Sequence, residues 1–186
     1  MDRTKAWEIL CEHTKTEPLR KHALAVEAAM RAYARKYGGD EEQWAIVGLL
    51  HDFDFEMHPN PEEHPVKGAE ILRAMGVPEE IVYAILCHAD YLGLERKTKM
   101  DQAIYAVDEL TGFIVAVALV RPNKSIQEVD AAAVRKKMKD RGFARAVNRE
   151  DITKGAEQLG VALEEHIAFV IEALKPVAGE LGIAGS

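Results

Sequence analysis

The sequence has little cysteine and no surplus of positive charge. The two cysteines, Cys11 and Cys87, form no disulfide framework and lie in no short metal or redox motif, so we expect them to pack as small apolar groups. A reducing, cytoplasmic location is therefore expected. Lys and Arg number 24 against 31 Asp and Glu, a formal net charge of −7. This balance argues against general nucleic-acid binding, because polyanion affinity comes from cationic side chains.

The first residues also lack the apolar core that is typical of a signal peptide, and no uninterrupted apolar run reaches membrane-spanning length. The first ten residues, MDRTKAWEIL, are charged from the second position. The apolar stretch 103–120 contains Asp108 and Glu109, and its uninterrupted part is far shorter than the ~20 residues that a bilayer requires. We therefore expect a buried core helix there and no membrane partner.

Strand signals are absent as well, and the chain is predicted to be all-α. No run alternates in polarity between hairpin turns, and no repeat, low-complexity tract or long linker divides the sequence. Apolar residues recur at helical spacing, which predicts a single-domain helical bundle over 1–186, with a core motif region over 17–115 and C-terminal helices within 125–181. Helices are expected over 2–13, 16–37, 40–51, 65–75, 78–88, 100–120, 129–140, 149–159 and 163–181, followed by a frayed GIAGS end.

Two short sequence patterns resemble the capping box at a helix N-terminus. Asp40 with Gln43, and Ser125 with Glu128, place a capping side chain three residues before an amide or carboxylate. Between the third and fourth predicted helices, residues 53–63 contain two prolines and an asparagine, so they are expected to form a loop.

Three histidines and one aspartate fall on the apolar faces of different predicted helices. His22, His51 and His88 lie on apolar stripes, and Asp108 lies in the most apolar helix of the chain. Each residue alone is open to a simpler interpretation, as a hydrogen-bonded core residue or an ion-pair partner. Burying all four polar side chains costs free energy unless each has a hydrogen-bond partner or a counter-charge. A bound metal ion does so, because neutral imidazoles and ionised carboxylates are its preferred ligands.

The adjacent pair His51-Asp52, with histidines on both sides and a later aspartate, resembles the signature of the HD superfamily of metal-dependent phosphohydrolases. LRKHALAVE is similar to the segment with the family's first histidine, and GLLHDFDFE to its His-Asp segment. HPVKGAEILRAMGVPEEIVYAILCHAD resembles the stretch with two further histidine ligands, and YAVDELTGF the closing aspartate segment. The resemblance covers residues 17–115 and implies the all-α HD-domain fold, in its HDIG-type two-metal branch.

The resemblance also implies a ligand set for one or two divalent ions, Mn, Fe, Co or Mg. The first ion would be held by His22, His51, Asp52 and Asp108, and the second by His64 and His88, with the Asp52 carboxylate as a bridge. The family's usual lysine after the His-Asp pair is missing, because the sequence continues Phe53-Asp54-Phe55. Substrate contacts of the cyclic-dinucleotide phosphodiesterase branch are therefore not carried over.

The implied activity is hydrolysis of a nucleotide or other small phosphate ester through a metal-bridging hydroxide. No P-loop and no glycine-bracketed serine suggest another hydrolytic route. Asp52 and Asp54 are the candidate catalytic residues, although Asp54 is equally consistent with a solvent-exposed loop carboxylate. The same ligand set also fits a di-iron oxygenase similar to inositol oxygenase, and a non-catalytic metal-stabilised binding module.

Basic residues are the candidates for binding a small phosphorylated substrate. Lys67 follows His64 by three positions, and Lys136 and Lys137 belong to the dense basic run 135–145. Such a run steers anionic substrates when it lies beside the site, and is otherwise a solvated helix face. The remaining histidines have no inward pattern and are expected at the surface: His13, His58 and His166.

Overall fold

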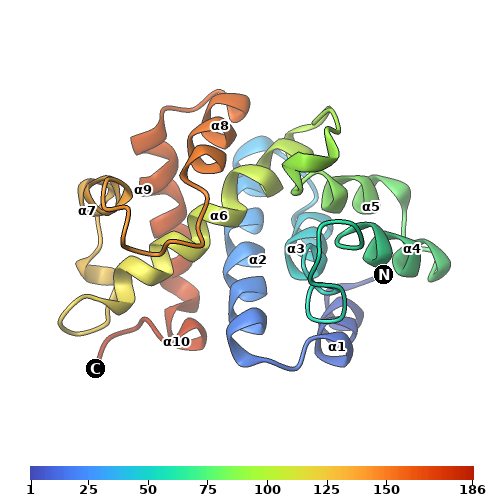
Figure 1. Ribbon diagram of the computed structural model, residues 1–186, viewed down its shortest axis with the longest axis horizontal. Coiled ribbons are helices and arrows are strands. Elements are labelled where there is room, and N and C mark those ends of the chain that lie inside the picture. Colours follow the sequence, from blue (N-terminus) through green and yellow to red (C-terminus); the bar gives the residue numbers. More distant parts are fainter.

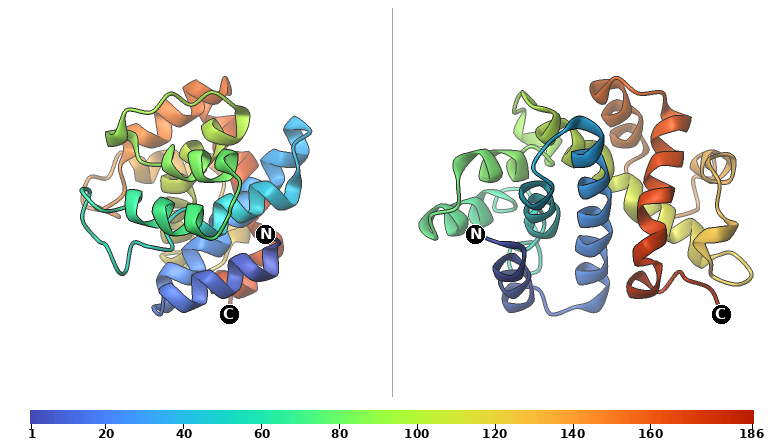
Figure 2. Two further views of the ribbon diagram at one scale, coloured as in Figure 1. Left: turned by 90° about the vertical axis from the view of Figure 1, so that its right-hand side faces the viewer. Right: turned by 180° about the vertical axis from the view of Figure 1, so that it is seen from behind.

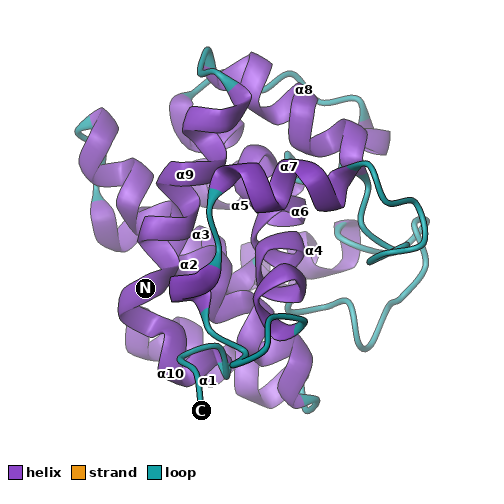
Figure 3. Cartoon of the chain, turned by 90° about the vertical axis from the view of Figure 1, so that its left-hand side faces the viewer, coloured by secondary structure: helices purple, strands orange, loops and turns teal.

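The computed structural model describes residues 1–186, and it consists of α-helices joined by turns, with no strand (Figure 3). The all-α prediction is confirmed, and the helices up to residue 159 agree with their expected ranges to within a few residues. The single helix expected over 163–181 is wrong, because a 3-10 turn that contains Pro176 interrupts it, and proline has no N–H to continue the helix. Short 3-10 helices lie at Asp90–Leu92, Ile126–Glu128 and Lys175–Val177. The α-helices are α1 (Arg3–His13), α2 (Glu17–Tyr37), α3 (Glu41–Leu50), α4 (Val66–Ala74), α5 (Glu79–Leu86), α6 (Lys99–Leu119), α7 (Ala131–Met138), α8 (Arg149–Leu159), α9 (Leu163–Leu174) and α10 (Ala178–Leu181).

The two predicted capping patterns have different outcomes. The Asp40 side chain accepts a hydrogen bond from the Gln43 backbone N–H at 3.0 Å and starts α3, as predicted. The Ser125 hydroxyl instead accepts from the Gln127 N–H at 3.2 Å, so the segment forms a short 3-10 helix. The predicted pairing of Ser125 with Glu128 as a capping box is therefore wrong, because the tighter turn satisfies a nearer donor.

Helices α2 and α6 form the centre of the molecule. In Figures 1 and 2, α1, α3, α4 and α5 lie on one side of α2, and α7 to α10 lie on the other, with α6 crossing between them. By length and composition α6 is apolar enough to cross a membrane, but 61% of its apolar window is buried inside the bundle. The helix packs against α2, α5, α8 and α9, which matches the prediction of a core helix.

A single hydrophobic cluster extends from Ala6 to Ile183. The predicted frayed end is therefore wrong. The Ile183 side chain is fully buried, and its carbonyl accepts a hydrogen bond from the Ile126 N–H at 2.8 Å. Ala184 then pairs with Ser125 in an isolated bridge. An apolar side chain near the end of the chain is enough to hold this tail against the core.

Gly48 allows α3 to lie unusually close to α2. A Cβ atom at this position would be 2.8 Å from the Glu27 Cα, closer than real side chains approach a backbone. Gly48 lies one helical turn before His51, and His22 lies on the facing helix. The missing side chain therefore brings two of the predicted ligands within reach of each other.

His166 is fully buried, and its expected surface position is wrong. Its Nε2 atom donates to the Ala106 carbonyl at 2.8 Å, and its Nδ1 accepts from the Tyr33 hydroxyl, so the ring ties α9 to α2 and α6. Burial lowers the pKa of His166 to about 4, so the imidazole is neutral at physiological pH. Both ring nitrogens are satisfied, which is what makes this burial tolerable.

Candidate metal centre

The predicted ligand residues converge from five separate parts of the chain. The first histidine is in the second turn of α2, and the His-Asp pair directly follows α3. The other two histidines lie just before α4 and just after α5, and the closing aspartate is in the middle of α6. Metal-capable atoms gather in two groups with one shared member: His22, His51, Asp52 and Asp108, and Asp52, His64 and His88.

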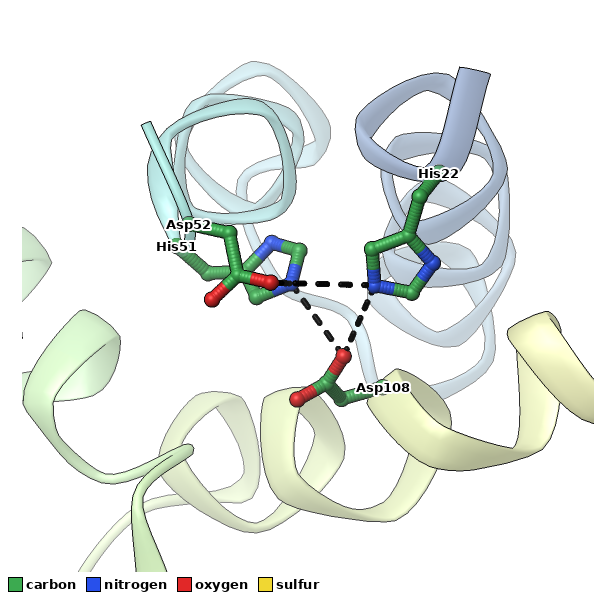
Figure 4. A group of neighbouring side chains, drawn as sticks. All are labelled: His22, His51, Asp52 and Asp108. Atoms are coloured by element: carbon green, nitrogen blue, oxygen red, sulfur yellow. Dashed lines mark hydrogen bonds and ion pairs between the residues drawn. The ribbon is translucent and has the colours of Figure 1, made fainter. Parts of the chain in front are cut away.

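The first group is arranged around the Asp108 carboxylate (Figure 4). Asp108 Oδ1 lies 2.9 Å from His22 Nε2 and 3.2 Å from His51 Nε2. Asp52 Oδ2 lies 3.4 Å from His51 Nε2 and 4.0 Å from His22 Nε2. Each residue offers one ligand atom, and all these atoms lie within 4.8 Å of one another. Two imidazole nitrogens and two carboxylate oxygens thus face a common point.

The second group uses the other oxygen of the same aspartate. Asp52 Oδ1 lies 3.1 Å from His64 Nε2 and 3.1 Å from His88 Nε2, and the two nitrogens are 3.2 Å apart. Asp52 therefore presents Oδ2 to one group and Oδ1 to the other. A single carboxylate with one oxygen toward each of two ligand groups has the arrangement of a bridging ligand.

The histidine rings are held so that Nε2 faces the centre. His51 Nδ1 is 2.7 Å from the Gly48 carbonyl, and His88 Nδ1 contacts the Ile85 carbonyl. A carbonyl only accepts, so each Nδ1 must donate its N–H, which leaves the Nε2 lone pair free in the neutral ring. Such contacts fix the tautomer that a metal requires. The donor set and its orientation therefore fit one or two divalent cations.

Asp54 supports His64 from behind. One of its oxygens lies 2.7 Å from His64 Nδ1, and the other accepts from the Gly68 N–H at 2.9 Å. Its side chain is 1% exposed and does not line the cavity at the centre. The solvent-exposed interpretation is therefore wrong, and a direct contact between Asp54 and a substrate is not supported. Any effect of Asp54 on the two ligand groups would therefore pass through the His64 ring.

Charge within the two groups is strongly coupled. Burial alone would lower the pKa of His64, but the Asp52 and Asp54 carboxylates outweigh it and raise that pKa to about 9. Burial is likewise outweighed at His51, where Asp52 and Asp108 hold the pKa well above its usual value. The facing histidines hold the pKa of Asp52 and of Asp108 below the usual range despite burial. The carboxylates thus favour positive charge at the histidine rings, as protons on the rings or as a metal ion in their place.

A cavity of about 520 Å³ opens onto both groups. None of its lining residues is lysine or arginine. Lys67 is paired with Glu70 at 3.1 Å, and Lys136 and Lys137 line a separate depression between α7 and the end of α6. The structure therefore does not bring the three predicted substrate-binding lysines to the cavity. Lys67 is held by its neighbour on α4, and Lys136 and Lys137 lie beside the end of α6.

Several cavity residues were missed by the sequence analysis. The Tyr105 hydroxyl donates to Asp151 at 2.7 Å, and the Glu109 carboxylate accepts from the Asn148 N–H at 3.0 Å. Burial, with a contribution from the Asp108 carboxylate, raises the pKa of Glu109 to about 7. Glu109 directly follows a predicted ligand and could have been found from that position. The residues of α8 carry no such signal, because they reach the cavity only through tertiary packing.

The amino-acid sequence of this chain was compared with family models and with curated proteins. The family model described as HD domain matches residues 19–112, about half of the chain. The chain is 26% identical over 179 residues to Ribonuclease Y from Desulfotalea psychrophila, an alignment covering 88% of this chain and 33% of that protein. It is 28% identical over 93 residues to Ribonuclease Y from Oleidesulfovibrio alaskensis, covering 50% of this chain and 18% of that protein.

The chain thus spans a third or less of the length of these curated relatives, and no solved structure matches it. The family match includes all six predicted ligand residues, which are the His-Asp pair and His22, His64, His88 and Asp108. The family match and the side-chain cluster agree, and this chain belongs to the HD-domain family.

Proposed function

We propose that this protein is a metal-dependent phosphohydrolase that acts on a nucleotide or other small phosphate ester. The observation that carries the proposal is the position of Asp52, with one oxygen toward each of two ligand groups. Membership of the HD-domain family supports it, since hydrolysis is the activity that the family suggests. Imidazole and carboxylate ligands favour divalent transition metals, and the identity of the metal is part of the proposal.

The residues of the chain have distinct roles in this proposal. His22, His51, Asp52 and Asp108 would hold one cation, and Asp52, His64 and His88 would hold the other. When bound, a pair of divalent cations supplies charge that stabilises a phosphoryl group and makes water a stronger nucleophile at neutral pH. The Gly48 and Ile85 carbonyls and Asp54 fix the orientation of the histidine rings through their Nδ1 atoms, so the ligands need no rearrangement during turnover.

A small ester is proposed in preference to RNA, although the curated relatives are named as ribonucleases. A protein that binds a polyanion neutralises its phosphates with Lys and Arg side chains. The cavity contains neither, and the chain as a whole carries a net charge of −7. These features favour a substrate whose single phosphate is taken by the metals.

The decisive experiment measures metal content and phosphate release together. The protein is purified without added metal, loaded separately with Mn²⁺, Fe²⁺, Co²⁺ or Mg²⁺, and assayed against a panel of phosphate esters with and without oxygen. We expect oxygen-independent phosphate release. Substitution of the shared carboxylate, Asp52→Ala, should abolish both metal loading and turnover. Glu62→Ala, an exposed carboxylate in the adjacent loop, is the matched control and should change neither.

Each alternative gives a different result in the same experiment. Product formation that requires oxygen and Fe²⁺ would support a di-iron oxygenase and overturn hydrolysis. Full metal loading without turnover of any ester would support a binding module. Full loading of Asp52→Ala would refute the bridging role of the carboxylate, whatever the reaction.

A further inference from the structure

The wall of the cavity beyond the metal ligands is acidic. Three carboxylates line it in addition to Asp52 and Asp108: Asp90, Glu109 and Asp151. Asp90 is neutralised, because its oxygens lie 3.0 Å from Lys154 Nζ and 3.2 Å from an Arg96 nitrogen. No lysine or arginine forms an ion pair with either remaining carboxylate. Glu109 and Asp151 therefore face the cavity without compensating charge.

The neutral groups of the wall add few free hydrogen-bond donors. The Tyr91 hydroxyl donates to the His64 carbonyl, and the Tyr105 hydroxyl donates to Asp151. The Asn148 N–H is used by Glu109. The two tyrosine protons are thus already taken, and the Asn148 side-chain oxygen caps α8 and leaves the amide N–H groups of that residue free. The acceptor oxygens of the wall therefore outnumber its free donors. A group bound against it must supply its own donors.

We propose that this cavity selects phosphate esters whose organic part carries hydroxyl or amine donors and no second anionic group, and that Glu109 and Asp151 set this selectivity. The inference rests on the proposed function, because it assumes that the phosphate lies on the metal side of the cavity. With one phosphate there, a second phosphate or a carboxylate would face two uncompensated carboxylates in a partly buried site. An ammonium group or a hydroxyl would meet acceptors at the same place.

Three phosphonates of similar size test the inference by binding, without turnover. Aminopropylphosphonate, hydroxypropylphosphonate and phosphonopropionate differ in the charge and in the hydrogen-bond donors at the far end. Their affinities for the manganese-loaded protein are measured by calorimetry without oxygen at about pH 8, where carboxylates are ionised. We expect the amine and the alcohol to bind at least roughly tenfold more tightly than the carboxylate, from the repulsion between like charges a few ångströms apart at low effective dielectric.

The variants Glu109→Gln and Asp151→Asn remove charge with little change in shape. Each keeps an oxygen that accepts the hydrogen bond of Asn148 or Tyr105, so the local contacts persist. Each should reduce the amine-to-carboxylate affinity ratio severalfold, by roughly threefold to tenfold. Glu157→Gln is the matched control, because it makes the same charge change at an exposed position on α8. The ratio is measured within one protein sample, so it does not depend on the fraction that folds.

The possible results are distinguishable. Equal affinity for all three phosphonates, or an unchanged ratio in both variants, would overturn the selectivity while phosphonate binding itself still supports the proposed function. If no phosphonate binds to fully loaded protein, the phosphohydrolase proposal fails and this inference fails with it.

Discussion

The substitution Gly68→Ala tests whether Asp54 positions His64 for a metal ion. A Cβ atom at residue 68 would lie 2.7 Å from Asp54 Cγ and 2.8 Å from Oδ2, whereas ordinary contacts begin at 3.4 Å. The carboxylate is buried between Gly68 and His64, so it has to move away from residue 68 and cannot keep its present contact with the His64 ring. Loss of such a supporting contact weakens metal binding by about 10- to 100-fold, or about 1.4–2.7 kcal/mol.

The expected result is selective. Calorimetric titration with Mn²⁺ should show the weakening for the ion held by His64 and His88, while the ion in the group of His22 and Asp108 binds normally. Gly112→Ala is the matched control, because a Cβ there meets only the His22 ring, at 3.9 Å. It should leave both affinities unchanged and stabilise α6 by up to ~1 kcal/mol through its higher helix propensity.

A second substitution makes the test independent of crowding. Asp54→Asn keeps the size of the side chain, but both partners of Asp54 present N–H groups and an amide offers only one acceptor oxygen. One N–H is left unpaired, and the second ion should again be weakened selectively. If Gly68→Ala and Asp54→Asn both bind two ions with wild-type affinity, Asp54 has no role in holding His64 and the reasoning is refuted.

Three further predictions follow from pKa values and burial. The second ion should bind more tightly as the pH rises to about 9 and should displace a proton, because the pKa of metal-free His64 is about 9; pH-independent titrations would contradict this. His166 has a folded-state pKa of about 4, below its unfolded value, so the unfolded state takes up the proton first and stability is lost as the pH falls from about 6.5 to 4, by up to roughly 3 kcal/mol. Chemical denaturation across that range should show this loss relative to His166→Gln, and parallel curves would refute it. A thiol reagent should modify the half-buried Cys11 before Cys87, which is buried and whose pKa burial raises to about 12; faster modification of Cys87 in folded protein would exclude the described packing.

The central part of the site was predictable because its residues carry both periodicity and local signatures. His22 and Asp108 lie on apolar helical faces, and the His-Asp pair is adjacent in the sequence. Inward direction and chain order therefore follow from the amino-acid sequence alone. The sequence does not predict that Asp52 directs one oxygen to each ligand group. That arrangement depends on how the turn after α3 meets the turn before α4.

The C-terminal half was less predictable, for two physical reasons. Asp151 reaches the cavity because α8 packs tightly on α6 at Gly155, where a Cβ would lie 2.6 Å from the Ala106 Cα, and no local pattern encodes that contact. His166 was mispredicted although a signal existed. Val170 and Leu174 follow at intervals of four residues on the buried face of α9, so the apolar stripe passes through the histidine.

The shared position of Asp52 gives the two ligand groups a nested order along the chain. The inner group spans residues 52 to 88, a separation of 36, whereas the outer group joins His22 to Asp108 across 86 residues. An ion in either group would act as a reversible cross-link in a protein that has no disulfide framework. Closing the longer loop restricts the unfolded chain more, by about 0.8 kcal/mol from the logarithm of the two lengths. Removal of the metal ions by a chelator should therefore destabilise α2 and α6, at the ends of this segment, more than the helices between them.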